Sequence, residues 1–216
     1  FKQAFDDWYA SIAITLPVLF LASAAAYVAI ESGFIAKIYD GVADITADKV
    51  VDRFKTTPVA SGALFNELFK DLAQSARNQA LYAIREGINS GLTNQEIIAE
   101  LRGKRTKVGD SYEYVGGIVE QAKNKIEANV RTARSALANA AYNDTFTALG
   151  YEYRKFLATL DGRTTKLCAS LSNNVYKMSE PHPTPTLHFR CRSILVGTDK
   201  DGNIAGKRPF VASNKP

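Results

Sequence analysis

The sequence is poor in the residues that most often build chemical sites. Its 216 residues include only two cysteines, two histidines, one methionine and one tryptophan. Two cysteines are too few for the disulfide framework of a small secreted scaffold. The sequence also lacks a GxxxxGK(S/T) or GxGxxG motif, which excludes the commonest nucleotide-binding loops. Hydrophobic residues make up 46% of the chain and charged residues 23%, as is typical of a folded globular protein.

Basic residues exceed acidic ones only slightly, and the excess lies at one end of the chain. The net charge of +5 is too small to indicate nucleic-acid binding by itself. Residues 1–50 carry three basic and six acidic side chains, whereas residues 151–216 carry eleven basic and five acidic ones. The basic excess therefore belongs to the C-terminal third.

One long stretch near the start of the sequence has no charge at all. Tyr9–Ile30 is an uncharged run of 22 residues, long enough to cross a bilayer. It does not resemble a secretory signal, because a single lysine and two aspartates precede it. The sequence opens on Phe1, so we expect further residues upstream.

Pro17 and the many small residues of this run favour a helix buried against other helices or against a partner. A transmembrane helix, and a segment that enters a membrane only at a special moment, are the alternatives. The candidates for partner or membrane contact are Leu16, Val18, Leu19, Phe20 and Leu21.

Apolar spacing predicts two long helices in the middle of the chain. Apolar residues recur every three or four positions from about residue 60 to Gly91, with Gly87 and Gly91 as breakers. The same period returns from Ile118 and ends at Gly150.

A short helix and a loop are expected between them. Thr93 and Glu96 have the spacing of a capping box, and Gly103 is a natural helix stop. Residues 103–117 are polar, and we predict a loop whose three basic residues are solvated.

After Gly150 the pattern changes to short strands and turns. Aromatic and apolar residues from 151 predict a strand that leads to a turn at Asp161, and further short strands are expected at 192–196 and from Asn203. The predicted fold is mainly α with a small α+β C-terminal domain. We divide the chain into an apolar helical segment (1–58), an extended helical arm (59–150) and a small, basic, loop-rich tip (151–216).

The tip contains every cysteine and histidine of the chain: Cys168, His182, His188 and Cys191. Four such residues within 24 positions suggest a structural zinc site, in which Cys168, His188 and Cys191 are ligands and His182 or Asp161 is the fourth. No CxxC pair is present, so we expect a disulfide or two buried thiols and no bound cofactor, with zinc as the alternative.

Enzymatic chemistry has weaker support in the same residues. Cys191 and His188 could pair as nucleophile and base, but no orienting residue can be assigned to them. A metal-assisted nuclease built on Asp161 and His188 has no better basis. We expect no catalytic residues and a protein that is not an enzyme.

The segment from Phe156 to Val196 resembles the C-terminal signature of phage head-morphogenesis minor head proteins, the phage Mu F-protein family. The matching residues are Leu160, Asp161, Arg163, Thr164, Cys168, Leu171, Val175, Tyr176, Pro185, His188, Cys191 and Arg192. A second element of the family is similar to Ala128, Arg131, Thr132, Asn139 and Ala140. The chain departs from the signature at Thr165 and Ser193, where many members have cysteine.

The resemblance implies a structural protein of the virion, inside the capsid near the portal vertex. Its partners would be the portal protein, other head proteins and the backbone of packaged DNA. We expect Asp161 to pair with Arg163 or Arg192 and, with the cysteines and His188, to hold the tip together. The candidates for DNA contact are Arg154, Lys155, Arg163, Lys166, Arg190, Arg192, Lys207 and Arg208. The alternative function is a membrane-active ejection protein that inserts Tyr9–Ile30 into a bilayer.

Overall fold

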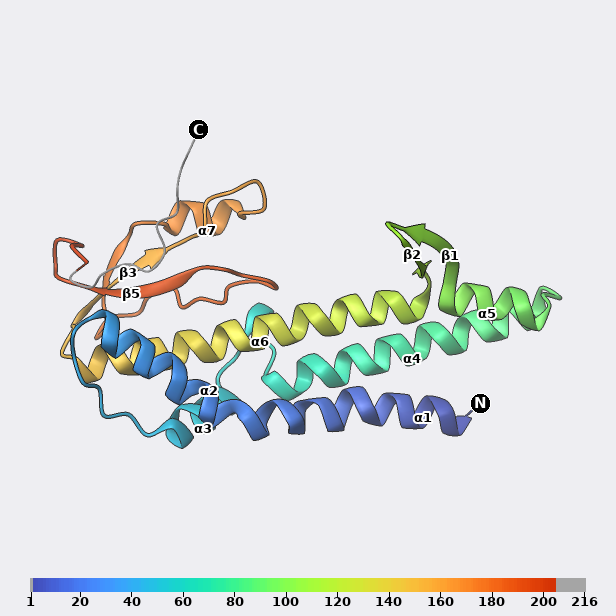
Figure 1. Ribbon diagram of the computed structural model, residues 1–216, viewed down its shortest axis with the longest axis horizontal. Coiled ribbons are helices and arrows are strands. Elements are labelled where there is room, and N and C mark those ends of the chain that lie inside the picture. The colour runs from blue at the N-terminus through green and yellow to red at the C-terminus, as the bar shows by residue number, and fades with distance from the viewer. Residues whose placement is uncertain (1, 205–216) are drawn as a thin grey trace. The chain divides into compact units, whose positions relative to one another are not determined.

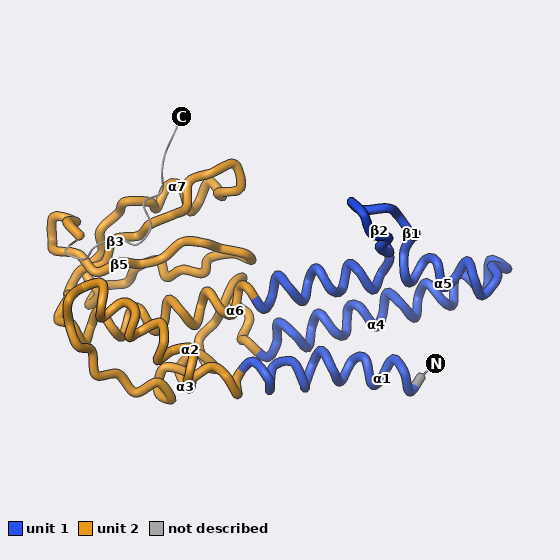
Figure 2. The backbone as a smooth tube through the Cα atoms, in the orientation of Figure 1, with its two compact units in different colours: residues 1–20, 66–130 blue, residues 21–65, 131–216 orange. Residues whose placement is uncertain are grey.

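The computed structural model describes residues 2–204. The chain forms two compact units (Figures 1 and 2). The first unit contains residues 1–20 and 66–130, and the second contains residues 21–65 and 131–216. Each unit therefore combines segments that are distant in the sequence. In this division residues 21–65 group with the C-terminal region, and the predicted boundaries near residues 58 and 150 stay a prediction.

Helices and one hairpin make up the first unit. Its elements are α1 (Lys2–Ala10), the π-helical turn η1 (Ser11–Thr15), the start of α2 (Leu16–Ile38), α4 (Phe65–Asn89), α5 (Asn94–Arg102), β1 (Gly103–Val108), β2 (Ser111–Gly116) and the first part of α6 (Ile118–Ala148). Ile12, Leu72 and Ala73 form a buried cluster, against which Trp8 and Ile126 pack. This cluster joins the N-terminal helix to α4 and α6.

Pro17 explains the π-helical turn that precedes α2. Proline lacks the N–H that would bond to the carbonyl four residues earlier, and its ring clashes with that carbonyl. The backbone widens over Ser11–Thr15 and then continues as α2. The uncharged run is thus helical throughout, as the sequence predicts.

The predicted helices are confirmed, with two corrections. The capping box of α5 is present, since Thr93 Oγ1 accepts from the Glu96 N–H at 3.3 Å and Glu96 Oε2 accepts from the Thr93 N–H at 2.7 Å. Gly87 does not break α4, which ends at Asn89. Residues 103–116 are not a loop but an antiparallel hairpin. The chain reverses at Gly109, which has positive φ, and β1 then pairs with β2 in regular register.

Two glycines fix the base of this hairpin. Gly103 has φ +88°, and a Cβ there would lie 2.3 Å from the Val115 carbonyl oxygen. A Cβ on Gly117 would lie 2.2 Å from the Arg102 carbonyl carbon. Backbone atoms cause both clashes, so no side-chain adjustment relieves them.

We therefore expect Gly103→Ala to open the hairpin and to cost about 2 kcal/mol or more of stability in the first unit. Gly109→Ala is the matched control, because Gly109 also has positive φ (+61°) but a Cβ there would have no atom within 4 Å. It should cost only about 1 kcal/mol, the penalty for the left-handed backbone. Amide hydrogen exchange of β1 and β2 measures the difference, and equal protection in both variants would contradict it.

The second unit contains a small antiparallel sheet. Its elements are the rest of α2, α3 (Ala47–Thr56), the 3-10 turn η2 (Ala60–Gly62), the rest of α6, β3 (Tyr153–Leu157), α7 (Lys166–Leu171), β4 (Val175–Lys177) and β5 (Ile194–Thr198). The strand order is β4-β3-β5. The predicted fold class, mainly α with a small α+β C-terminal part, is confirmed. No strand begins at Asn203 within the described residues.

The core of the second unit joins helices to the sheet. Ile35 from α2, Phe146 from α6 and Val196 from β5 form its buried cluster. Tyr39 packs edge-on against Phe146 at 4.8 Å between ring centroids and donates a hydrogen bond to the Gly197 carbonyl at 3.2 Å. The sheet is therefore anchored on the C-terminal ends of α2 and α6.

Candidate functional site

A row of polar side chains on α6 positions the site. The Thr132 hydroxyl accepts a hydrogen bond from the Arg190 N–H at 2.9 Å. One turn further on, the Ser135 hydroxyl donates to the Cys191 carbonyl at 3.2 Å, and the Asn139 amide then donates to the Ser193 carbonyl at 3.3 Å. Residues three and four apart share one face of a helix, so this face holds the backbone of residues 190–193 in place.

Helix α7 brings the second part of the site. Thr165 is its N-cap, and its hydroxyl accepts from the Cys168 N–H at 3.3 Å. This cap sets the first turn of the helix and points the buried Cys168 thiol toward the segment held by α6. Thr165 and Cys168 are separated from that segment by more than 20 residues in the sequence.

Cys168, His188 and Cys191 meet in one cluster, as predicted. The Cys168 sulfur lies 3.2 Å from His188 Nε2 and 3.8 Å from the Cys191 sulfur, and the three potential ligand atoms lie within 4.8 Å of one another. Both cysteines are free, so the disulfide that the sequence left open is not formed.

The hydrogen bonds of His188 assign its tautomer. His188 Nδ1 lies 2.9 Å from the Phe189 carbonyl, which can only accept, so Nδ1 carries the proton. In the neutral ring, Nε2 then presents a lone pair to Cys168 and to the Thr165 hydroxyl, which is 3.2 Å away. A carbonyl that holds the other ring nitrogen in this way is typical of metal-binding histidines.

The environment of Cys168 favours its thiolate. Burial raises the pKa of the thiol, but hydrogen bonds with its neighbours, those of Ser193 and Thr165 being the largest, outweigh it and lower the pKa overall. A thiolate is the form that binds a metal.

The cluster fits three corners of a zinc site. Two thiolates on one tetrahedral zinc lie about 3.8 Å apart when the Zn–S bonds are about 2.3 Å, which is the separation of Cys168 and Cys191. A small cavity of about 20 Å³ adjoins Cys168 and His188 and is also bordered by Thr165 and Ser193. That volume suits one water-sized occupant. Thr165 and Ser193, at which the resemblance implies cysteine in many members of the family, thus border the same cavity.

Neither residue predicted as a fourth ligand is in the cluster. His182 lines a different pocket, and its Nδ1 lies 2.8 Å from the Glu180 carbonyl. Asp161 instead forms a bidentate pair with Arg192, with both N–O distances at 2.6 Å. A fourth ligand would be a water molecule or one of the neighbouring hydroxyls.

The Asp161–Arg192 pair closes the loop that leads into α7. Asp161 also accepts from the Arg163 N–H at 2.9 Å, and the Thr164 hydroxyl accepts from the Asp161 N–H at 2.8 Å and donates to the Thr159 carbonyl. Asp161 thus lies in a turn and pairs with Arg192. Hydrogen bonds from Arg192 and then from the Arg163 backbone hold the pKa of Asp161 well below its usual range.

This shift predicts an acid-sensitive loop. The folded carboxyl binds a proton less readily than the unfolded one, so its stabilisation is complete above the ordinary aspartate pKa of about 4 and is lost as the pH falls through the lower folded value. We expect the melting temperature of wild type to exceed that of Asp161→Asn at neutral pH, and the difference to shrink only in strong acid. A difference that stays the same down to the most acidic measurable pH would contradict this.

Arginines line a larger hollow that also includes His188. Its volume is about 460 Å³, and it is lined by Arg131, Arg163, Arg190 and Arg192 together with Phe189 and Ser135. Arg163, Arg190 and Arg192 are candidates for DNA contact that the structure brings together. Arg131 comes from α6 and was not predicted as such a candidate, because only the packing of α6 against residues 190–193 places it here.

The other DNA candidates have different positions. Arg154 is wrong as a surface contact, because it is fully buried. Lys155 is half-buried and donates to the Gly202 carbonyl at 3.2 Å, whereas Lys166 is exposed on α7. Lys207 and Arg208 lie outside the described residues.

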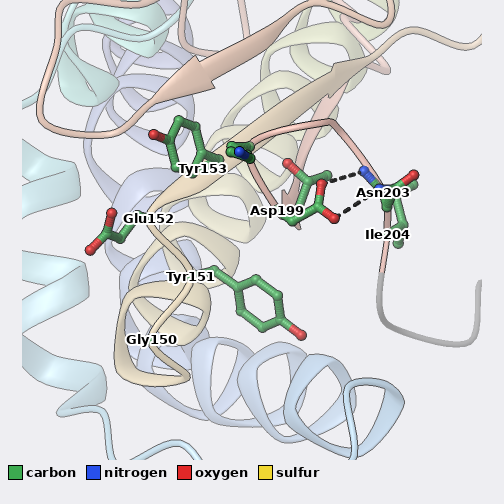
Figure 3. A pocket seen from close by; sticks show the side chains of 9 residues that line it. Gly150, Tyr151, Glu152, Tyr153, Asp199, Asn203 and Ile204 are labelled. Carbon is green, nitrogen blue, oxygen red and sulfur yellow. Dashed lines mark hydrogen bonds between the residues drawn. The ribbon is translucent and has the colours of Figure 1, made fainter.

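A further pocket of about 450 Å³ lies at the ends of β3 and β5 (Figure 3). The carboxylate of Asp199 faces Asn203 there and accepts from its backbone and side-chain nitrogens, each at 2.8 Å, and from the Asp201 N–H at 2.9 Å. These bonds lower the pKa of Asp199. The Asp199 carboxylate accepts these hydrogen bonds from its own turn, so we assign it a structural role in stabilising that turn.

The described residues cover the uncharged N-terminal run only in part: Ile12, Ala24 and Val28 are buried, but other side chains of the run are exposed. The helix Gln3–Ile38 is long and apolar enough to span a membrane, and only 22% of its most apolar window is buried. Val18 and Leu19 are 60% and 62% exposed, whereas Leu16, Phe20 and Leu21 are half-buried. Burial inside the chain alone, one of the predicted environments, is therefore not what the structure shows.

Comparison with known families gives one result. Residues 78–196 match the family described as Phage Mu protein F like protein, which is more than half of the chain. The match includes α6, the cysteine–histidine cluster and every residue that lines the arginine-lined hollow. No curated protein and no solved structure matches the chain.

Proposed function

The chain belongs to the Phage Mu protein F like family and is a structural protein of phage heads; from this premise we propose that it is a minor head protein docked on the portal vertex, inside the capsid. The observation that carries the docking is the exposed apolar surface at the start of α2. Val18 and Leu19 are large, apolar and more than half exposed. Such side chains are typical of a surface that a partner covers.

The test is made in assembled particles. An asymmetric reconstruction of the virion by electron microscopy should show this chain at the portal vertex. The double variant Val18→Asp/Leu19→Asp should lower its incorporation into heads, because charges would be buried in the interface. Gln79→Asp, on the exposed face of α4, is the control and should be incorporated normally. Normal incorporation of both variants would exclude this docking surface.

A membrane is the second candidate partner of the same helix. Its length and exposed apolar side chains support this alternative. Flotation of the full chain with phospholipid vesicles distinguishes the two partners: partition that Val18→Asp/Leu19→Asp abolishes would favour membrane insertion, and its absence favours docking on protein.

We also propose that the arginine-lined hollow contacts the backbone of packaged DNA. Guanidinium groups form paired hydrogen bonds with phosphate oxygens, and four of them line one hollow, where Arg192 is already paired with Asp161. The contact would be independent of sequence and would weaken as salt increases. In a DNA-binding assay, Arg163→Ala/Arg190→Ala should weaken binding and reduce its salt dependence, whereas Lys177→Ala on exposed β4 should change neither. Binding that does not weaken with salt would exclude the proposal.

For the cysteine–histidine cluster, we propose structural zinc rather than catalysis. The sulfur–sulfur distance, the orientation of His188 and the small adjoining cavity support zinc. Catalysis by a Cys–His pair would need a side chain that orients the base. The Phe189 backbone carbonyl occupies that position on His188. The role of the cluster would be to tie α7 to the segment held by α6.

A further inference from the structure

The hairpin β1–β2 has two chemically different faces. Its register pairs Arg105 with Tyr114 and Lys107 with Tyr112, so these four side chains share one face. The opposite face carries Lys104 and Val115 together with Thr106 and Glu113, which are also paired. The first face is therefore basic and aromatic, and the second has no net charge.

Two guanidinium groups lie over the tyrosine rings of the basic face. Arg105 lies over Tyr112 with 4.7 Å from its guanidinium carbon to the ring centroid. Arg102, the last residue of α5, lies over Tyr114 at 4.0 Å. Both tyrosines are exposed, at 60% and 44%. Stacking on a ring restrains a guanidinium group while its N–H edges remain available to an anion.

Acidic side chains near the hairpin do not neutralise this face. Glu113 belongs to the opposite face, and Asp110 is in the turn. Glu120, at the start of α6, accepts a hydrogen bond from the Gly116 N–H at 2.5 Å. Arg105 and Lys107 of β1, with Arg102 of α5 over Tyr114, therefore present three positive charges on this face.

We propose that this face of the hairpin is a nucleic-acid contact that binds the phosphate backbone of double-stranded DNA. It rests on the proposed contact of the protein with packaged DNA and adds a second surface, in the first unit, to the arginine-lined hollow of the second. Charge complementarity identifies the occupant, because three aligned cations without a carboxylate among them match a polyanion. An acidic protein surface is the alternative that the test excludes.

The experiment measures binding of the full chain to a short labelled DNA duplex by fluorescence anisotropy at several salt concentrations. Lys107→Ala and Lys104→Ala form a matched pair, because each removes one lysine from β1 but from opposite faces. Each phosphate contact contributes about 0.9 to the slope of log K against log salt concentration. Relative to 1 M salt, one contact is therefore worth roughly eightfold in affinity at 0.1 M salt. Lys107→Ala should lose roughly eightfold and about 0.9 of slope, and Lys104→Ala should lose less than twofold.

A second variant tests the aromatic support. Tyr112→Ala/Tyr114→Ala keeps every charge but releases the guanidinium groups, and it should weaken binding with the salt slope nearly unchanged. Circular dichroism and exchange protection of β1 confirm that the hairpin remains folded in each variant.

Comparison with Arg163→Ala/Arg190→Ala separates the two DNA surfaces. If that variant weakens binding while Lys107→Ala does not, the hairpin proposal is overturned and the hollow stands. If Lys107→Ala weakens binding and the hollow variant does not, the hairpin stands alone. Equal losses for Lys107→Ala and Lys104→Ala would also overturn the hairpin proposal, because they would reflect net charge rather than one face.

Discussion

Replacing Arg154 with methionine is expected to destabilise the second unit by about 3–5 kcal/mol. Arg154 belongs to β3 and its side chain is fully buried, with one guanidinium nitrogen donating to the Tyr151 carbonyl at 2.6 Å and the other to the Asn143 carbonyl at 3.1 Å and to the Thr147 hydroxyl at 3.0 Å. Methionine has a similar volume but no donor. Each buried acceptor left without a partner costs about 1–3 kcal/mol, so the cost is large although packing is preserved.

The electrostatics of Arg154 support the same expectation. Burial lowers the pKa of its guanidinium to about 10, so the group is still charged at neutral pH and depends on these carbonyls for the stabilisation that water would supply. Its guanidinium carbon also lies 5.3 Å from the centroid of the Phe146 ring, in the core of the unit. Loss of Arg154 therefore affects both the end of α6 and the start of the sheet.

Lys155→Met is the matched control, since it removes one positive charge from the next position of β3. Its ammonium group makes one bond of 3.2 Å to the Gly202 carbonyl, and a half-buried contact of this kind contributes less than about 1 kcal/mol. Urea unfolding followed by far-ultraviolet circular dichroism, with hydrogen exchange of the β3 amides, measures both variants. Similar midpoints for the two would show that Arg154 is not a structural centre of the unit.

We expect each chain to bind one zinc ion, and we expect this ion to stabilise the second unit. A ligand that binds only the folded state adds about 2.7 kcal/mol at a free concentration 100 times its Kd. The metal-free protein should therefore melt at a lower temperature, and Zn²⁺ should restore the higher value. Cobalt(II) in place of zinc should give thiolate-to-metal charge-transfer absorption, because two cysteines are ligands.

Cys168→Ser and His188→Ala should each abolish the cobalt spectrum and the zinc-dependent shift in melting temperature. His182→Ala is the control, since it removes a histidine that is outside the cluster. Thr165→Cys should strengthen zinc binding, because residue 165 borders the small cavity and a thiolate there would supply a fourth ligand. Absence of binding in wild type, with both thiols reduced, would show that the cluster is held by hydrogen bonds alone.

Local patterns allowed several elements to be predicted correctly. The capping box of α5 depends on two residues three positions apart, and the apolar faces of α4 and α6 repeat at the helical period. Asp161 was assigned to a turn with an arginine partner because aspartate favours such turns. In each case the interactions lie within a few residues of sequence, or the pattern repeats often enough to be recognised.

The hairpin at 103–116 shows how a local pattern can mislead. Its basic and polar residues are typical of a loop, and neither strand has a buried face that would produce an apolar alternation. Pairing between the strands, and the two glycines that fit closely at their base, form it instead. Only the resulting register separates Lys104 from Lys107, which the sequence presents as equivalent basic residues.

Arg154 and Arg131 show the same limit for charged residues. The residues next to them in the sequence gave no sign that Arg154 would be buried among backbone carbonyls, or that Arg131 would line the hollow beside Arg163 and Arg190. Burial and hydrogen bonding of a cation depend on groups far away in the sequence. The sequence by itself determined the long helices and the capped helix α5, the turn at Asp161, the family and the three residues of the cysteine–histidine cluster, because these depend on short motifs and repeating periods. Tertiary structure alone decided which arginines are buried, which lysine shares a face with the tyrosines and that Thr165 and Ser193 border the cavity beside Cys168, because long-range packing sets the surroundings of each side chain.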